Sequence, residues 1–197
     1  MKRVFKYIGK GLLIIIVAFA LGLGSLVASI YIQEKGPWRK VRNGPWETGL
    51  NTGSIEAGPY TRAKVALFGT LALDPSEVVY YIAFNDSTGQ PLDCRCNYRI
   101  EGKDLSTRWW SVTVYKDFHF IPNDQKRYSY SKTNISSDKD GRWIVKLSSK
   151  PQEGNWIPLG DREGRLILAL RLYNPDPSAI EGLDSIDLPD IIREGCR

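Results

Sequence analysis

A long apolar run near the amino terminus is the strongest pattern in the sequence. Residues 11–32 are 22 consecutive positions without a charged side chain. A helix of this length extends about 33 Å, which covers the hydrocarbon core of a bilayer. A buried helix of a soluble domain usually keeps a polar face, and this run has none. The pattern therefore predicts a transmembrane helix over residues 11–32.

A cleaved signal peptide is the alternative for the same segment. Val27 and Ser29 have the spacing of the small residues that precede a cleavage site. The apolar region of a signal peptide usually spans about 7–15 residues, which is shorter than this run. The length therefore favours a retained anchor.

Basic residues flank the apolar run on both sides and leave its orientation open on charge count alone. Four precede the run and four follow it: Lys2, Arg3, Lys6, Lys10, Lys35, Arg39, Lys40 and Arg42. A short basic tail with a free amine is costly to translocate, whereas long domains cross a membrane largely regardless of charge. We therefore expect residues 1–10 to be a cytoplasmic tail and the chain after the helix to lie on the opposite side.

The segment 33–58 is rich in Gly, Asn, Thr and Pro and shows neither helical nor strand periodicity. This composition predicts a linker. Trp38 and Trp46 lie in the segment among the basic residues. They are interpreted either as anchors in the lipid headgroup layer or as ordinary core or loop tryptophans, and the sequence does not decide between the two.

A helical pattern follows the linker. Val65, Phe68 and Ala72 recur at helical spacing, and Pro59 stands where the first turn of a helix favours proline. The pattern predicts an early helix within residues 60–73 that docks on a sheet.

Short β-prone runs separated by turn signals make up the rest of the chain. They cover residues 78–84, 96–100, 109–115, 127–131, 142–147 and 165–173. In the fifth run, Trp143, Val145 and Leu147 point one way while Arg142 and Lys146 point the other, as in a half-buried strand. The last run is apolar on both faces and is expected at the centre of a sheet. Together they predict a mostly β domain over residues 59–197, a jelly-roll-like antiparallel β-sandwich with one early helix.

The net charge of +5 is concentrated in the amino-terminal tail. The chain has 27 basic and 22 acidic residues, and four of the basic ones lie in residues 1–10. Without those four, 23 basic residues stand against 22 acidic ones. A nearly neutral domain lacks the basic surface that nucleic acid requires, so we expect no nucleic-acid partner.

Few residues offer a catalytic or metal-binding pattern. His119 is the only histidine, no Gly-x-Ser-x-Gly motif occurs, and a triad would need partners from elsewhere in the chain. Cys94 and Cys96 are separated by one residue and no second Cys/His pair follows, so no zinc site is expected. The sequence has no Gly-rich phosphate-binding loop, and we expect no metal and no cofactor.

Several motifs in the β-rich region carry a resemblance to a known family. They are the strand Arg108–Tyr115, the triplet Arg127–Ser129, the hairpin Asp140–Trp143, the turn Gly154–Pro158 and the strand Leu170–Pro175. With these motifs in order, residues 60–197 resemble a bacterial domain-of-unknown-function family, number 1214, and its short membrane-anchored subgroup. The resemblance implies a jelly-roll-type sandwich and an envelope location, but no reaction. Longer relatives join a second domain, number 1254, which this sequence lacks.

The polar and aromatic residues of these motifs are the candidate ligand-binding residues: Tyr115, Asn155, Trp156, Arg171 and Tyr173. Arg171 shares its strand face with Tyr173, so its guanidinium is expected to be partly buried and to need a carboxylate or carbonyl partner. Tyr115, Asn155 and Trp156 are expected to border a cleft that offers stacking faces and hydrogen bonds to a ligand. The alternative is a structural ion pair at Arg171 and aromatic rings that fill the core.

These patterns predict an envelope protein that crosses the bacterial inner membrane once, with its domain in the periplasm. The domain is expected to act without catalysis, either by binding a small molecule, a glycan or an envelope protein, or by supporting envelope structure. The alternative is an envelope hydrolase acting on a glycan or a small ester. For that alternative the sequence supplies no recognisable set of nucleophile, base and orienting residue.

Cys94, Cys96 and Cys196 are the three cysteines of a chain whose domain is expected in an oxidising compartment. Residues two apart on a strand have parallel side chains and Cα atoms about 6.5 Å apart, so Cys196 is expected to pair with one of the other two. Such a bond closes a loop of about 100 residues and stabilises a fold by up to about 4.7 kcal/mol. The resemblance implies Cys96 as the partner. The alternative is three unpaired thiols, the expected state in a reducing compartment.

Overall fold

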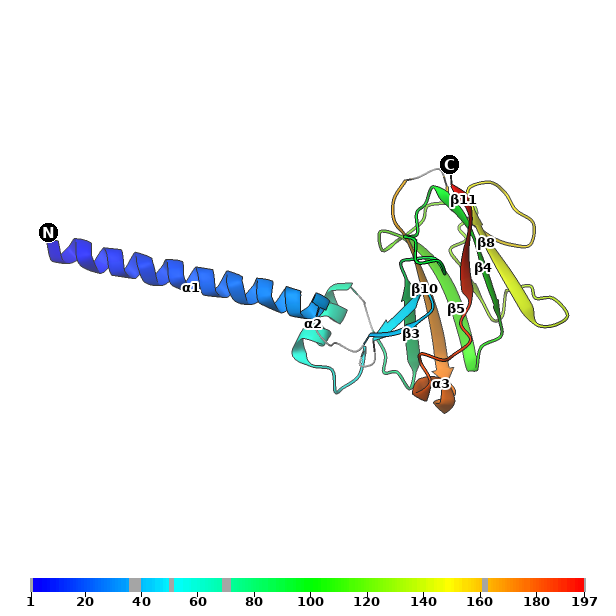
Figure 1. Cartoon of the computed structure of the whole chain (residues 1–197), viewed down its shortest axis with the longest axis horizontal. Helices are drawn as coiled ribbons and strands as arrows, with labels where there is room; N and C mark the ends of the chain where they lie inside the picture. The colour runs from blue at the N-terminus through cyan, green and yellow to red at the C-terminus, as the bar shows by residue number, and fades with distance from the viewer. Residues whose placement is uncertain (1, 36–39, 50–51, 69–71, 161–162, 197) are drawn as a thin grey trace. The chain divides into compact units, whose positions relative to one another are not determined.

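The computed structural model describes residues 2–35, 40–49, 52–68, 72–160 and 163–196 (Figure 1). The chain divides into two compact units, Met1–Arg39 and Lys40–Arg197. The first unit is a helix and the second is built mainly from strands.

The amino-terminal unit consists of helix α1 (Lys2–Lys35). Its stretch Gly9–Ser29 has a mean hydropathy of 2.6 and is not buried by the rest of the protein. Ser25 and Ser29 donate their hydroxyl hydrogen bonds to carbonyls of the same helix, both at 2.8 Å, so these hydroxyls do not require water. As predicted, the helix is long and apolar enough to span a membrane.

The carboxy-terminal unit contains two sheets. The seven-stranded sheet comprises β1 (Lys40–Asn43), β2 (Trp46–Gly49), β3 (Val78–Ala83), β10 (Leu166–Pro175), β5 (Thr107–Lys116), β6 (His119–Phe120) and β7 (Ser129–Ser131). Its order is β1-β2-β3-β10-β5-β6, and β7 also pairs with β5. The four-stranded sheet comprises β11 (Asp190–Cys196), β4 (Cys96–Lys103), β8 (Arg142–Ser148) and β9 (Asn155–Pro158), in that order. All pairs are antiparallel except β8 with β9.

The core lies between the two sheets and draws on both. On β10 the inward side chains are Leu166, Leu168, Leu170 and Leu172, all buried. Trp110 of β5 stacks on Trp143 of β8 with ring centroids 4.9 Å apart, which joins the sheets face to face. The mostly β sandwich is therefore confirmed, and so is the central position of β10 between β3 and β5.

A hairpin of β1 and β2 lies inside the segment 33–58, where the sequence indicates no strand. β2 pairs with β3, so the hairpin extends the seven-stranded sheet. Trp46 is 0% exposed, and its indole Nε1 donates to the carbonyl oxygen of Pro189 at 2.7 Å. Its interpretation as a core tryptophan is confirmed and the headgroup interpretation is wrong. Trp38 lies outside the described residues.

Helix α2 (Pro59–Phe68) confirms the early helix and begins at the predicted proline. Arg62 donates from Nε to the carbonyl of Ala57 at 2.9 Å, which ties the helix to the preceding loop. The side chain of Phe68 lies outside the described residues, so the docking of this helix on a sheet stays a prediction. A short helix that the sequence analysis does not predict, α3 (Pro177–Glu181), follows β10.

A disulfide joins Cys96 to Cys196 across a sequence separation of 100. The two residues face each other in the register of β4 and β11, so the bond fastens the edge strand β11 to its neighbour. The predicted pairing is confirmed. Cys94 is buried and unbonded, and burial raises the pKa of its thiol to about 11. That thiol therefore stays protonated and unreactive at neutral pH.

Candidate functional site

The outer face of the seven-stranded sheet carries most of the predicted site residues. Side chains alternate along a strand, so the residues of β10 and β5 that do not enter the core share this face. Register places Tyr173 opposite Trp109, and Arg171 opposite Ser111. We call the surface around Arg171 the aromatic face, made up of Trp109, Tyr115, Phe120, Tyr128, Arg171 and Tyr173.

Arg171 is half-buried near the middle of this face. Its Nη1 donates to the hydroxyl Oγ1 of Thr113 at 3.1 Å, and its Nη2 donates to the phenol oxygen of Tyr115 at 2.8 Å. The guanidinium carbon also lies 5.8 Å from the centroid of the Tyr115 ring. Both hydrogen-bond partners come from β5, the neighbour of β10 in the sheet, so the strand pairing itself positions the guanidinium.

Arg171 is not paired with a carboxylate within the described residues. The ion pairs found in that part of the chain do not include it. In place of the expected carboxylate or carbonyl partner, two hydroxyl groups accept its hydrogen bonds there. A hydroxyl that accepts a hydrogen bond from a guanidinium keeps its own proton to donate. Arg171, Thr113 and Tyr115 together therefore have an excess of hydrogen-bond donors and a positive charge.

Aromatic rings stand on both sides of Arg171 along the strands. On one side Trp109 contacts Tyr173, with ring centroids 5.0 Å apart. On the other side Phe120 stacks on Tyr115 at 5.2 Å and contacts Tyr128 at 5.0 Å. Trp109 and Tyr115 are six positions apart on β5, which corresponds to about 20 Å.

The surface between the two aromatic groups is built from small residues. Ser111, Thr113 and Ala169 lie there and are buried beneath their larger neighbours. Small side chains leave the long side chain of Arg171 room to lie along the sheet towards Tyr115. The cation is consequently held in place by packing as well as by hydrogen bonds.

Asn155 and Trp156 lie away from the aromatic face, on β9 of the four-stranded sheet. The amide of Asn155 is 7% exposed and donates to the carbonyls of Ser136 and Ile144 at 2.8 and 2.9 Å. The indole of Trp156 donates to the carbonyl of Ser148 at 2.9 Å. These polar groups serve the fold. The structure thus places Tyr115, Arg171 and Tyr173 on one sheet face and brings Tyr115 against Arg171, but not the other two candidates, and ligand binding stays a prediction.

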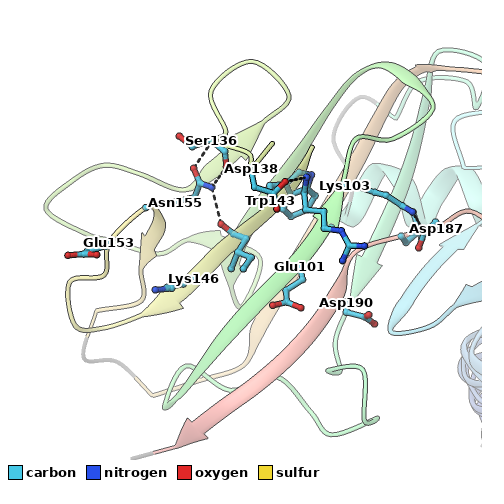
Figure 2. A pocket seen from close by; sticks show the side chains of 15 residues that line it. Glu101, Lys103, Ser136, Asp138, Trp143, Lys146, Glu153, Asn155, Asp187 and Asp190 are labelled. Carbon is cyan, nitrogen blue, oxygen red and sulfur yellow. Dashed lines mark hydrogen bonds and ion pairs between the residues drawn. The ribbon is translucent and has the colours of Figure 1, made fainter. Parts of the chain in front are cut away.

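A groove of about 630 Å³ lies on the outer face of the four-stranded sheet (Figure 2). Its charged lining residues are Glu101, Asp138, Glu153, Asp187, Asp190, Lys103, Arg142 and Lys146. Acidic residues outnumber basic ones among them, and Lys103 pairs with Asp187 at 2.6 Å. Asn155 borders the groove, with its amide engaged by backbone groups.

His119 is exposed on the short strand β6. Its ring Nδ1 lies 2.8 Å from the carbonyl oxygen of Asp117, and within the described residues no hydrogen bond joins the ring to a serine or a carboxylate. The hydrolase alternative that uses this histidine therefore has no geometric support. Across the described ranges, no three His, Cys, Asp or Glu side chains are grouped as metal ligands.

Sequence reasoning missed three residues of the aromatic face, Trp109, Phe120 and Tyr128, and also Thr113, which accepts a hydrogen bond from Arg171. Thr113 could have been identified from the sequence, because strand alternation puts position 113 on the same face as position 115. Phe120 pairs with Tyr115 only after the chain reverses at Asp117 and Phe118, which both have positive φ values. Neither residue is a glycine, so the usual sequence sign of a two-residue turn is missing there.

Comparisons with known proteins add a family and a fold. A family model described as "Protein of unknown function (DUF1214)" matches residues 77–177, which include every residue of the aromatic face. The VPA0106 protein from Vibrio parahaemolyticus has a similar crystal structure, with 26% identity and a TM-score of 0.58. The match covers 71% of this chain but 36% of the Vibrio protein, so the chain spans little more than a third of that length.

A second similar structure is a putative uncharacterized protein from Burkholderia cenocepacia, at 17% identity and a TM-score of 0.39. The match covers 74% of this chain and 44% of the Burkholderia protein. No curated protein matches the sequence.

Proposed function

We propose that this chain is a membrane-anchored binding protein without catalytic activity. The chain belongs to the DUF1214 family, which is described as a protein of unknown function. Helix α1 holds it in a bacterial inner membrane, with residues 1–10 in the cytoplasm and the sandwich in the periplasm. There the aromatic face binds an anionic ligand.

Two features support the location. The apolar stretch of α1 has the length of a membrane span. The Cys96–Cys196 disulfide suits an oxidising compartment, because thiols are kept reduced in the cytosol. A carboxy-terminal alkaline phosphatase fusion is expected to be active, whereas activity of a cytoplasmic reporter in its place would reverse the orientation.

The charge of Arg171 is the observation that carries the binding proposal. A guanidinium that is partly withdrawn from water is costly unless another group compensates it. Thr113 and Tyr115 supply hydrogen bonds but no negative charge. A carboxylate or phosphate on a ligand supplies the missing charge and accepts two parallel N–H bonds from one guanidinium.

Titration of the full-length protein in detergent micelles with glucuronate and with glucose tests the proposal. Glucuronate is expected to raise the melting temperature saturably, because a ligand that binds the folded state stabilises it. Glucose, which lacks the carboxylate, is expected to have little effect. The shift should shrink at high salt, since the contact is ionic.

Arg171→Gln is expected to abolish the response to glucuronate. Arg142→Gln is the matched control, because it removes an exposed cation from the four-stranded sheet. An unchanged glucuronate response in Arg171→Gln, or no response in the unmodified protein, would refute anion binding at this face.

A further inference from the structure

We propose that the ligand of the aromatic face is an acidic oligosaccharide that contacts both aromatic groups, a proposal that rests on anion binding at Arg171. The two groups are Trp109 with Tyr173, and Tyr115 with Phe120 and Tyr128. Nothing in the single anion contact requires both groups, so their placement calls for its own explanation.

The spacing of the aromatic groups sets the length of the ligand. Trp109 and Tyr115 are separated by about 20 Å along β5. This span exceeds one sugar ring, so a ligand that touches both groups must be a chain. The guanidinium of Arg171 lies beside Tyr115, so a carboxylate of the ligand binds at that group while the rest of the chain extends along the sheet towards Trp109.

The exposure of the rings indicates how the ligand is held. Phe120 is 56% exposed although it stacks on Tyr115, so one of its faces is open to solvent. Trp109 and Tyr173 are half-buried, so part of each side chain is open to solvent. Flat, partly exposed rings of this kind offer an apolar surface beside polar groups, which suits the C–H face and hydroxyls of a sugar.

Charge distinguishes this face from the other large surface of the domain. The groove on the four-stranded sheet is lined by more acidic than basic side chains, so it repels a polyanion. The aromatic face presents Arg171 without a carboxylate in the described chain. Of these two surfaces, the aromatic face is therefore the more favourable place for an acidic glycan to bind.

Oligogalacturonates of one to six residues, titrated into the full-length protein in detergent micelles, test the length requirement. Affinity is expected to rise at least tenfold from the monomer to the hexamer, because stacking on a second aromatic group adds about 1.4 kcal/mol or more. Neutral malto-oligosaccharides of equal length are expected to bind at least tenfold more weakly than the acidic series. Equal affinity of monomer and hexamer would overturn the oligosaccharide while leaving anion binding in place.

Phe120→Ala is the decisive variant, because Phe120 is exposed and its removal leaves the core intact. It is expected to weaken hexamer binding about tenfold, because one stacking surface is lost. Ile144→Ala, which removes an exposed apolar side chain from the other sheet, is the control and should bind the hexamer normally. An unaffected hexamer affinity in Phe120→Ala would overturn the proposal, and so would equal binding of neutral and acidic hexamers. Failure of the monomer to respond, or a normal response in Arg171→Gln, would instead remove the anion site itself.

Discussion

The outer faces of the two sheets handle charge in opposite ways. On the four-stranded sheet, Arg99 lies 2.5 Å from Glu101 and 3.7 Å from Glu194, and Lys103 pairs with Asp187. On the seven-stranded sheet, Arg171 has two hydroxyl partners and no carboxylate within the described residues. The first face carries ion pairs within β4, between β4 and β11, and between β4 and the loop before β11, and the second combines one cation with aromatic rings.

This difference distinguishes the two faces as candidate ligand sites. In surface ion pairs each charge is compensated by its partner, and such a face needs no further partner in water. A cation held by neutral groups keeps its charge available, and the rings around it lower the local polarity and strengthen an ionic contact. The four-stranded sheet has a groove of about 630 Å³, but the seven-stranded sheet has the cation that is not paired with a carboxylate in the described part of the chain.

The largest expected effect comes from breaking the covalent bond that holds the edge of the four-stranded sheet. Cys196→Ser is expected to lower the free energy of unfolding by up to about 4.7 kcal/mol, because it releases a closed loop of roughly 100 residues. Chemical denaturation of the oxidised proteins measures this. Cys94→Ser keeps the bond and serves as control, and equal midpoints for Cys196→Ser and the unmodified protein would contradict the prediction.

The next effect concerns Asp86, which is 1% exposed and pairs with Arg193 of β11 at 3.0 Å. Burial by itself would raise the pKa of this carboxyl, but hydrogen bonds from Thr88 and Gln90 and the charge of Arg193 outweigh it and hold the pKa below the usual value. The stability it contributes is therefore present above the unfolded pKa of about 4 and is lost as the pH falls through the lower folded pKa.

Asp86→Asn should accordingly destabilise the domain at pH 7 by about 2–3 kcal/mol, because a hydrogen-bonded buried charge is lost. The variant should also lose part of the stability change that the unmodified protein shows below pH 4. Urea denaturation between pH 2 and 7 measures both. A variant with the same acid-induced loss as the unmodified protein would show that Asp86 does not titrate in this range.

The smallest effects compare one arginine from each face. Arg171→Ala is expected to lower the free energy of unfolding by about 1–2 kcal/mol, because it removes hydrogen bonds and packing but breaks no ion pair. Arg142→Ala should stay within about 0.5 kcal/mol, as at a typical surface site. Denaturation midpoints rank the two variants. A loss above about 3 kcal/mol at Arg171 would indicate a buried partner charge.

The strands with local alternation were predictable from sequence. Trp143, Val145 and Leu147 are buried as predicted, while Arg142 on the same strand is exposed. Strands β1 and β2 were not predictable in this way, because Gly, Asn and Thr are frequent in the sequence around them. Their strand conformation depends on the pairing of β1 with β2 and of β2 with β3. A pattern within four residues does not reveal a partner more than thirty positions away.

The candidate site was predictable only in part, for a similar reason. Alternation placed Arg171 and Tyr173 on one face, but the partner of Arg171 depends on which strand lies beside β10. Thr113 and Tyr115 occupy that position through the antiparallel register of β5. The polar side chain of Asn155 makes it a candidate ligand-binding residue in the sequence. In the structure its amide instead donates hydrogen bonds to two backbone carbonyls.

The position of β10 has a kinetic consequence. This strand pairs with β3 and β5, so residues 168–173 must find residues 78–83 and 109–114 before the seven-stranded sheet can close. Pairings so distant in sequence make folding slow, and the edges of β3 and β5 stay open to other chains until the last third of the domain has been synthesised. The domain therefore folds late, as one long-range event. The unfolded chain needs protection from aggregation during that interval.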